Sequence, residues 1–220
     1  NDTIIKPNTL NAFANYSVDH PDSILGSKLL NYYKQDFYDH IGGVWNLKNA
    51  QFDLLLKGSS ASHSLDTNQP IDYICGASLF APRKVFQAVA LFDERYFLYY
   101  EEADWCQRAK KMGYTCRICY DAVVYHKGAG SQDDPSVLLA YYLSRNRFLY
   151  IYKNLPITKK IYSFAIPVAW QTSKLILQYA LKSIYPKNKQ RTKRLKTLSA
   201  RIKGVCDALK NNYYARKTIM

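Results

Sequence analysis

Several features that would place this protein in a particular class are missing from its sequence. Its five cysteines, an odd number, lie mostly in apolar or helical contexts, which argues against a disulfide framework and favours a reducing compartment. Cys116 and Cys119 form one C-x-x-C, but no second pair completes a zinc site, so neither a metal nor a redox role is predicted for them. There are no internal repeats and no Gly-rich phosphate-binding loop.

A clean membrane-spanning segment is also lacking. Ile161 to Leu181 has the length of a span, which needs roughly 20 predominantly apolar residues, but Gln171, Lys174 and Gln178 interrupt it. These polar residues recur at spacings of three and four, which places them on one face of a helix. The pattern is typical of an amphipathic helix in the plane of a membrane, and equally of a helix packed on the domain.

Acidic residues are scarce at the C-terminal end of the chain. The net charge is +14, and residues 182–220 hold 12 Lys and Arg against the single acid Asp207, a net charge of +11. Such a basic region could bind nucleic acid or anionic lipid. Apolar residues make up 48% of the 220 positions, which is enough for a hydrophobic core and argues against global disorder.

Alternating strand and helix patterns predict an α/β fold for the first part of the chain. We expect strands at 23–30, at 73–80 and on either side of a turn at Asp121. After about residue 134 the pattern becomes helical with aromatic faces. We therefore divide the chain into an α/β part, residues 1–135, and a helical, basic extension, residues 136–220.

Three helices are expected within the α/β part. The first begins near Asn8 with Leu10, Phe13 and Ala14 on one apolar face, and the second runs from Pro82 to about Ala90. The third is expected from about Ala103 to Met112, with Gly113 in the favoured position after its end.

The stretch FLYYEEADWCQRAKKMGY, Phe97 to Tyr114, gathers three carboxylates within four positions of an otherwise basic chain. One interpretation of Glu101, Glu102 and Asp104 is a solvated acidic turn that caps the following helix. The other is a pair of working carboxylates at the mouth of a site. Arg108 lies four residues after Asp104 and is expected to pair with it.

The stretches DYICGASLFAPRKVF, ALFDERYFLYYEEADWCQRAKKMGY and DAVVYHKGAGS together resemble a known family. Between Ile71 and Ser131 their order and spacing are similar to the second half of the catalytic domain of family 2 glycosyltransferases, which have the GT-A fold. The closest likeness is to the bacterial rhamnosyltransferase-like branch. A weaker likeness extends back to Asn1 and forward through the C-terminal helices. The resemblance implies that residues 1–135 are the C-terminal half, the metal and acceptor side, of a GT-A catalytic domain with a Rossmann-like mixed sheet.

In that family an Asp-x-Asp-like motif binds the divalent cation through its last Asp. The opening NDT is similar to the end of that motif, which makes Asp2 the metal-binding carboxylate. The chain is then expected to lack the preceding nucleotide-binding half. His126 follows Glu102 by 24 positions, the separation at which relatives complete the cation site, so Asp2 and His126 are the expected ligands of Mg²⁺ or Mn²⁺.

The resemblance also assigns Glu101 and Glu102 to the family's Glu-Asp pair, whose second member is the catalytic base. Glu102 is therefore the expected base, but a Glu stands where Asp is usual, which leaves Glu101 as the alternative. Gly76, Asp93 and Asp104 are the expected substrate-binding positions. A bulge in a strand is the other interpretation of Gly76, and helix support that of Asp104.

The resulting hypothesis is an inverting, metal-dependent glycosyltransferase of surface-polysaccharide biosynthesis. It would use a nucleotide-diphosphate sugar and a lipid-linked acceptor on the cytoplasmic, inner face of the plasma membrane, held there by its basic region. Two alternatives stay open at this stage. One is a nucleic-acid-binding protein that uses residues 182–220, and the other is a catalytically inactive glycosyltransferase-like scaffold.

Overall fold

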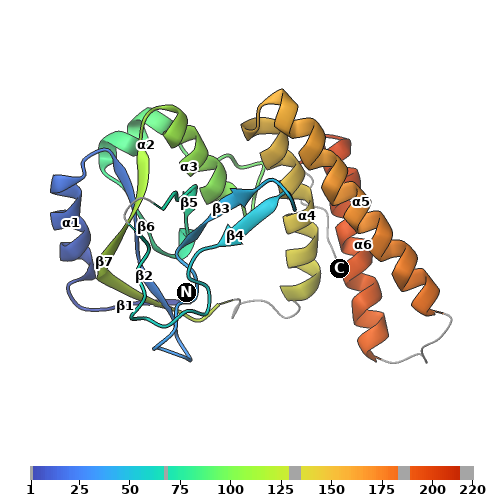
Figure 1. Ribbon diagram of the computed structural model, residues 1–220, viewed down its shortest axis with the longest axis horizontal. Helices are drawn as coiled ribbons and strands as arrows, with labels where there is room; N and C mark the ends of the chain where they lie inside the picture. The colour runs from blue at the N-terminus through green and yellow to red at the C-terminus, as the bar shows by residue number, and fades with distance from the viewer. Residues whose placement is uncertain (1, 67–68, 129–134, 183–188, 214–220) are drawn as a thin grey trace. The chain divides into compact units, whose positions relative to one another are not determined.

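The computed structural model describes residues 2–66, 69–128, 135–182 and 189–213 (Figure 1). The chain forms two compact units, each built from three separate segments that alternate along the sequence. The first comprises Asn1–Trp45, Phe52–Asp93 and Glu101–Gln132, and the second Asn46–Gln51, Glu94–Tyr100 and Asp133–Met220. The second unit therefore includes two segments from the first 135 residues, which the division drawn from the sequence does not anticipate.

A mixed sheet forms the centre of the first unit. Its strands lie in the order β1 (Thr3–Ile5), β7 (Thr115–His126), β2 (Ser23–Asn31) and β6 (Leu79–Phe80). β2 and β7 are parallel, whereas β1 and β6 pair with their neighbours in the antiparallel sense. β2 is buried along most of its length, as its apolar sequence predicts. This mixed α/β arrangement is compatible with a Rossmann-like fold.

A smaller sheet has the order β4 (Gln51–Leu54), β3 (Gly42–Asn46) and β5 (Tyr73–Ile74). Gly42 has φ +138°, and a Cβ there would lie 1.9 Å from the carbonyl oxygen of Tyr73. Only glycine permits this close pairing of β3 with β5. The pairing places the end of β5 beside the start of β3, close to the residues considered below as a site.

The structure corrects two of the strand predictions. Residues 73–80 do not form one strand, because a 3₁₀ turn at Gly76–Ser78 separates β5 from β6. Residues 115–126 form one strand instead of two joined by a turn at Asp121. The pairing of β7 with β2 jumps from Cys119 to Val123, so the predicted turn is a bulge within a continuous strand.

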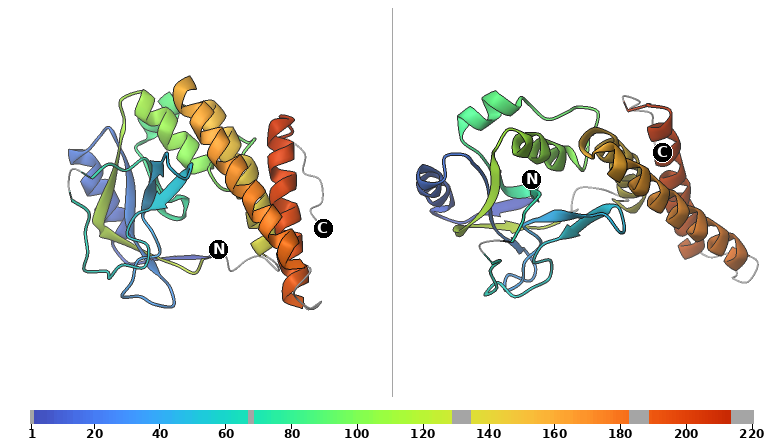
Figure 2. Two further views of the ribbon diagram at one scale, coloured as in Figure 1. Left: turned by 45° about the vertical axis from the view of Figure 1, so that its right-hand side comes forward. Right: turned by 45° about the horizontal axis from the view of Figure 1, so that its top comes forward.

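Helix α1 (Thr9–Asp19) packs on β7 through a different face from the one predicted. Phe13 is buried, but Leu10 is 64% exposed and Ala14 is also exposed. The buried face instead contains Thr9, whose hydroxyl donates a hydrogen bond to the Val123 carbonyl at 2.8 Å. The sequence prediction failed here because a buried threonine with a backbone partner does not register as an apolar position. Figures 1 and 2 show α1 on one side of the sheet and α3 on the other.

Helix α2 (Arg83–Val89) starts directly after Pro82, as predicted, and α3 (Glu101–Lys111) starts two residues earlier than predicted. Glu101 and Glu102 therefore belong to the first turn of α3. Trp105 of α3 is fully buried and donates a hydrogen bond to the Ala90 carbonyl at 2.7 Å. This contact fixes α3 to the end of α2.

The second unit contains the long helices α4 (Pro135–Asn154), α5 (Ile157–Lys182) and α6 (Lys189–Leu209). α4 packs along α6 and more sparingly against α5 (Figures 1 and 2). A Cβ at Gly204 of α6 would lie 2.5 Å from the Tyr141 carbonyl oxygen of α4, so the two helices approach closely there. Among the described residues, none of the helices is both long enough and apolar enough to cross a membrane.

Candidate functional site

The paired glutamates lie at the N-terminus of α3, beside the 3₁₀ turn that follows β5. The carboxyl of Glu102 accepts hydrogen bonds from the backbone N–H groups of Glu102, Ala103 and Gly76. The Oε2 atoms of Glu101 and Glu102 are both buried, and neither has a hydrogen-bond partner among the described residues. A buried acceptor of this kind is costly unless a ligand or a proton satisfies it.

The environment of these two carboxyls favours their protonated forms. Burial, reinforced by the neighbouring charge of Glu101, raises the pKa of Glu102 to about 8. Burial also raises the pKa of Glu101. The backbone hydrogen bonds to Glu102 act in the opposite direction but do not outweigh burial. A carboxyl whose pKa lies near neutral pH is suited to proton transfer.

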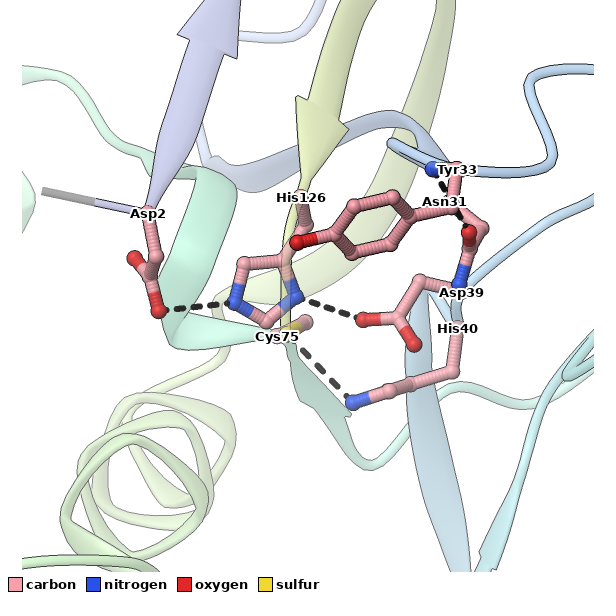
Figure 3. Close-up of polar contacts among 7 residues, drawn as sticks. All are labelled: Asp2, Asn31, Tyr33, Asp39, His40, Cys75 and His126. Carbon is pink, nitrogen blue, oxygen red and sulfur yellow. Dashed lines mark hydrogen bonds and ion pairs between the residues drawn. The ribbon is translucent and has the colours of Figure 1, made fainter. Parts of the chain in front are cut away.

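A second group of polar residues surrounds His126 at the end of β7 (Figure 3). Its Nε2 lies 3.3 Å from Oδ2 of Asp2, and its Nδ1 lies 2.6 Å from Oδ2 of Asp39. The hydrogen bond to Asp39 raises the pKa of His126 and outweighs the opposing effect of burial. The imidazole is thus held between two carboxylates.

The carboxyl of Asp39 is the stronger of the two partners of His126. Burial alone would raise the pKa of Asp39, but the hydrogen bond with His126 and the nearby His40 and Lys57 lower it overall. Asp39 therefore stays ionised and fixes the orientation of the His126 ring. This leaves Nε2 directed toward Asp2, as Figure 3 shows.

Cys75 lies between the two groups. Its Sγ is 3.6 Å from Nε2 of His40, and the next residue in the chain is Gly76. Burial, together with the smaller effects of the charges of Glu102, Asp39 and Asp2, raises the pKa of Cys75 to about 12. Cys75 is therefore an uncharged thiol and not a nucleophile. Because all three carboxylates act on it, the glutamate pair and the His126 group lie around the same point of the first unit.

The structure brings Asp2 together with His126, and Gly76 together with Glu101 and Glu102, from four separate stretches of sequence. Gly76 is neither in a strand nor a strand bulge. It lies in the 3₁₀ turn, where its backbone N–H meets Glu102. A Cβ at this position would lie 3.6 Å from the Glu102 side chain, an ordinary contact, so the backbone group is what matters at Gly76.

Asp104 and Asp93 occupy different environments. Asp104 is fully buried, and its Oδ2 accepts a hydrogen bond from Nε of Arg108 at 3.0 Å, the i,i+4 pair expected from the sequence. The Arg108 guanidinium also donates to the carbonyls of Val89 and Leu91. Asp104 therefore supports the helix and is inaccessible to a substrate, which corrects its assignment as a substrate-binding residue. Asp93 is partly buried and is the last residue of the Phe52–Asp93 segment of the first unit.

Asp39 and His40 are site residues that the sequence analysis missed. They directly precede the buried Ile41, Gly42 and Gly43. Adjacent Asp and His residues immediately before a buried strand are a signal that could have identified them. Nothing local in the sequence, however, indicates that Asp39 meets a histidine 87 positions away.

Asp2 and His126 together offer one carboxylate and one imidazole to a cation. Among the described residues, no set of three or more His, Cys, Asp or Glu side chains is arranged to hold a metal ion. The donor types fit Mn²⁺ or Mg²⁺, which also take oxygen ligands from phosphates. Asp39 behind His126 is the kind of second carboxylate that usually orients a ligating histidine.

No family model matches the chain. The chain is 35% identical over 85 residues to the N-acetylglucosaminyl-diphospho-decaprenol L-rhamnosyltransferase of two Mycobacterium tuberculosis strains. The matched segment covers 38% of this chain and 28% of that protein. The chain is 29% identical over 82 residues to the low-salt glycan biosynthesis hexosyltransferase Agl10 of Haloferax volcanii, covering 37% of this chain and 27% of that protein. Both relatives are named as glycosyltransferases. The matches span little more than a quarter of each curated relative.

Proposed function

We propose that this protein is an inverting glycosyltransferase with a GT-A fold that moves a hexosyl or deoxyhexosyl group from a nucleotide-diphosphate sugar to an acceptor hydroxyl. The observation that carries the proposal is Glu102, a buried carboxyl with a pKa of about 8 that is held by the backbone of Gly76 and paired with Glu101. The similarity to two named glycosyltransferases over a little over a third of the chain supports the same class of reaction.

Glu102 acts as the base in this proposal. As the acceptor oxygen bonds to the anomeric carbon, the bond from that carbon to the diphosphate oxygen breaks, and the diphosphate leaves with the electron pair. The hydroxyl proton passes to the Glu102 carboxylate. The raised pKa makes Glu102 a better proton acceptor than an ordinary glutamate. The charge of Glu101 contributes to that raised pKa, and Glu101 remains the alternative base.

Asp2 and His126 would hold a divalent cation, Mg²⁺ or Mn²⁺, with Asp39 fixing the His126 ring. Bound there, the cation would neutralise the charge that develops on the leaving diphosphate. The chain's own contribution is to hold the Asp2 carboxylate and the His126 imidazole facing one another. The charge of Asp2 and that of Glu102 both raise the pKa of Cys75.

A lipid-linked glycan acceptor fits the same proposal. The Mycobacterium relative is named for a decaprenol-linked substrate, and the present chain carries a net charge of +11 on residues 182–220. Lys and Arg near an anionic membrane contribute about 1 kcal/mol each to binding. We assign the protein to the cytoplasmic face of the plasma membrane as a peripheral protein of surface-glycan synthesis.

The test is sugar transfer by the natural protein, with UDP-, GDP- and dTDP-sugars and lipid-linked acceptors, in the presence of Mn²⁺ or of a chelator. Wild type would be compared with Glu102→Gln, His126→Ala and, as a control, His63→Ala in an exposed loop. We expect metal-dependent transfer that Glu102→Gln slows by about 100-fold or more and that the control retains. Absence of transfer with every donor and acceptor would contradict the proposal and favour an inactive relative.

A further inference from the structure

Two adjacent buried residues of α4, Arg145 and Asn146, are held by an unusual set of hydrogen bonds. Arg145 is 1% exposed and Asn146 is fully buried, although both are strongly polar. The Nε of Arg145 donates to Oδ1 of Asn146 at 2.9 Å, which locks the two side chains together. Burying a guanidinium and an amide in this way is costly unless both are fully hydrogen-bonded.

The partners of this pair are backbone carbonyls of one short segment. Arg145 Nη2 donates to the carbonyls of Arg95 and Tyr96, at 2.7 and 2.8 Å. Asn146 Nδ2 donates to the carbonyls of Tyr96, Leu98 and Tyr99, at 2.7 to 2.8 Å. Four carbonyls within five consecutive residues are therefore bound by two side chains.

The remaining contacts of Arg145 fix its position. Its Nη1 donates to the Tyr213 carbonyl at 3.1 Å, and its guanidinium lies 4.8 Å from the centre of the Tyr142 ring. The ring faces and the carbonyl dipoles offset the charge of the guanidinium. A lysine could not make the same contacts, because it lacks the planar fork of donors.

The bound segment has a backbone that needs this support. Phe97, Tyr99 and Tyr100 have φ values of 59°, 65° and 74°, a backbone region that residues other than glycine rarely adopt. Such strained residues persist only where the surroundings over-determine them, and they concentrate at functional sites. The ring of Phe97 also packs on Tyr142 of α4, with centroids 5.3 Å apart.

The strained segment leads directly into the glutamate pair. Tyr100 is the last strained residue, and the peptide bond after it joins Glu101, the first residue of α3. Residues 94–100 belong to the second unit and Glu101 to the first, so the peptide bond between Tyr100 and Glu101 is the link through which the held segment can act on the start of α3.

From this juxtaposition we infer that Arg145 and Asn146 are positioning residues of the transfer reaction. They hold residues 95–99 in the conformation from which α3 starts, and so keep Glu102 in place as the base. This inference rests on the proposed function for the reaction itself, but the holding of the segment can be measured without any activity.

The experiment compares wild type with Asn146→Ala and Arg145→Lys, and uses Arg194→Lys, an exposed position of α6, as the matched control. Amide hydrogen exchange is measured across residues 95–102 and across α6. The titration of the Glu102 carboxyl is followed by carbon-13 NMR, and kcat and the donor KM are measured in the transfer assay.

We expect both variants to exchange at least tenfold faster across residues 95–102 while α6 stays within twofold of wild type. The titration midpoint of Glu102 should move from about 8 toward its ordinary value of 4.5, because the carboxyl becomes less buried. The kcat should fall at least tenfold with the donor KM within threefold. The control should match wild type in every measurement.

Unchanged exchange across 95–102 with an unchanged Glu102 titration would overturn the inference. Equally faster exchange across α6, or failure of both variants to fold, would also overturn it, because the pair would then support the helical unit as a whole. If wild type transfers no sugar, the proposed function fails, whereas the exchange and titration results still decide whether the pair places Glu102.

Discussion

At the scale of single residues, the site depends on carboxyls whose surroundings give them opposite protonation behaviour. Burial and the charge of Glu101 raise the pKa of Glu102 to about 8, whereas the hydrogen bond with His126 helps to lower that of Asp39. One carboxyl is thus suited to exchanging a proton, and the other to staying charged behind an imidazole. Pairs of titratable groups whose surroundings shift their pKa values in opposite directions are typical of functional sites.

Glu102 should make the folded protein less stable as the pH rises. Its pKa is higher in the folded than in the unfolded chain, so its contribution to stability is fully present below pH 4.5 and is lost as the pH rises toward 8. Relative to wild type, Glu102→Gln should therefore gain up to about 1.4 kcal/mol per pH unit over this range. Urea unfolding at pH 5 and pH 8 measures the difference.

The control for this stability measurement is Glu94→Gln, at an exposed glutamate that precedes the acidic stretch in the sequence. It should leave the pH dependence of unfolding as in wild type. Parallel pH dependences for wild type and Glu102→Gln would show that the carboxyl of Glu102 is not buried in solution.

Asp39→Asn should weaken cation binding without removing a ligand. The asparagine keeps the shape of Asp39 but not the charge that fixes the His126 ring, and loss of such a second carboxylate typically costs about 10- to 100-fold in metal affinity. Titration of Mn²⁺ followed by electron paramagnetic resonance measures the affinity. Asp36→Asn, at an exposed aspartate nearby, is the control, and equal affinities for both variants would contradict the role of Asp39.

At the scale of elements, the sequence predicted helices and strands best where the pattern was local. The buried strand at 23–30, the helix after Pro82 and the C-terminal helices were all predicted correctly. Residues 73–80 were predicted wrongly, because a short apolar run does not reveal the 3₁₀ turn at Gly76. That turn supplies the backbone N–H that meets Glu102, so the error concerned the element that shapes the site.

The roles of individual site residues were harder to predict than their presence. The stretch around Glu101 and Glu102 is conspicuous in the sequence, because three acids stand together in a basic chain. Asp39 and the Arg145–Asn146 pair were not identified, since their partners lie 87 and about 50 positions away. Long-range hydrogen bonds of this kind leave no periodic signal in the sequence.

The packing of α4 on α6 should depend strongly on Gly204. A Cβ there would lie 2.5 Å from the Tyr141 carbonyl oxygen, so Gly204→Ala forces the helices apart or distorts them. We expect a loss of about 1–3 kcal/mol in the free energy of unfolding, the usual cost of overpacking. Chemical denaturation measures it, with the exposed Lys203→Ala as control, and equal stability of both variants would contradict the close approach.

At the scale of the whole molecule, charge and site chemistry are separated along the chain. The residues proposed for catalysis and cation binding lie between Asp2 and His126, whereas most of the net positive charge lies after residue 181. A chain organised in this way can bind a charged surface through one region while another carries out the reaction. Membrane binding can therefore be tested with variants that leave Glu101 and Glu102 unchanged.

Replacing Lys196, Lys203 and Lys210 with Gln should weaken binding to anionic vesicles on the order of 100-fold, from about 1 kcal/mol for each lysine. These three positions are exposed in the second unit. Sedimentation with phosphatidylserine-containing vesicles at low and high salt measures it, and the binding should fall as salt rises. The control replaces Lys34, Lys57 and Lys111, which are exposed in the first unit, and equal losses in both triple variants would contradict a specific role for the basic region.

The most direct test of the central claim is the pH dependence of sugar transfer by wild type and by Glu102→Gln. If Glu102 is the base, it must be deprotonated to act, so the wild-type rate should rise with pH and level off above about 8. The Gln variant should be slower by about 100- to 10,000-fold and should lose this rise. A variant that keeps both the rate and the pH profile of wild type would show that Glu102 is not the base.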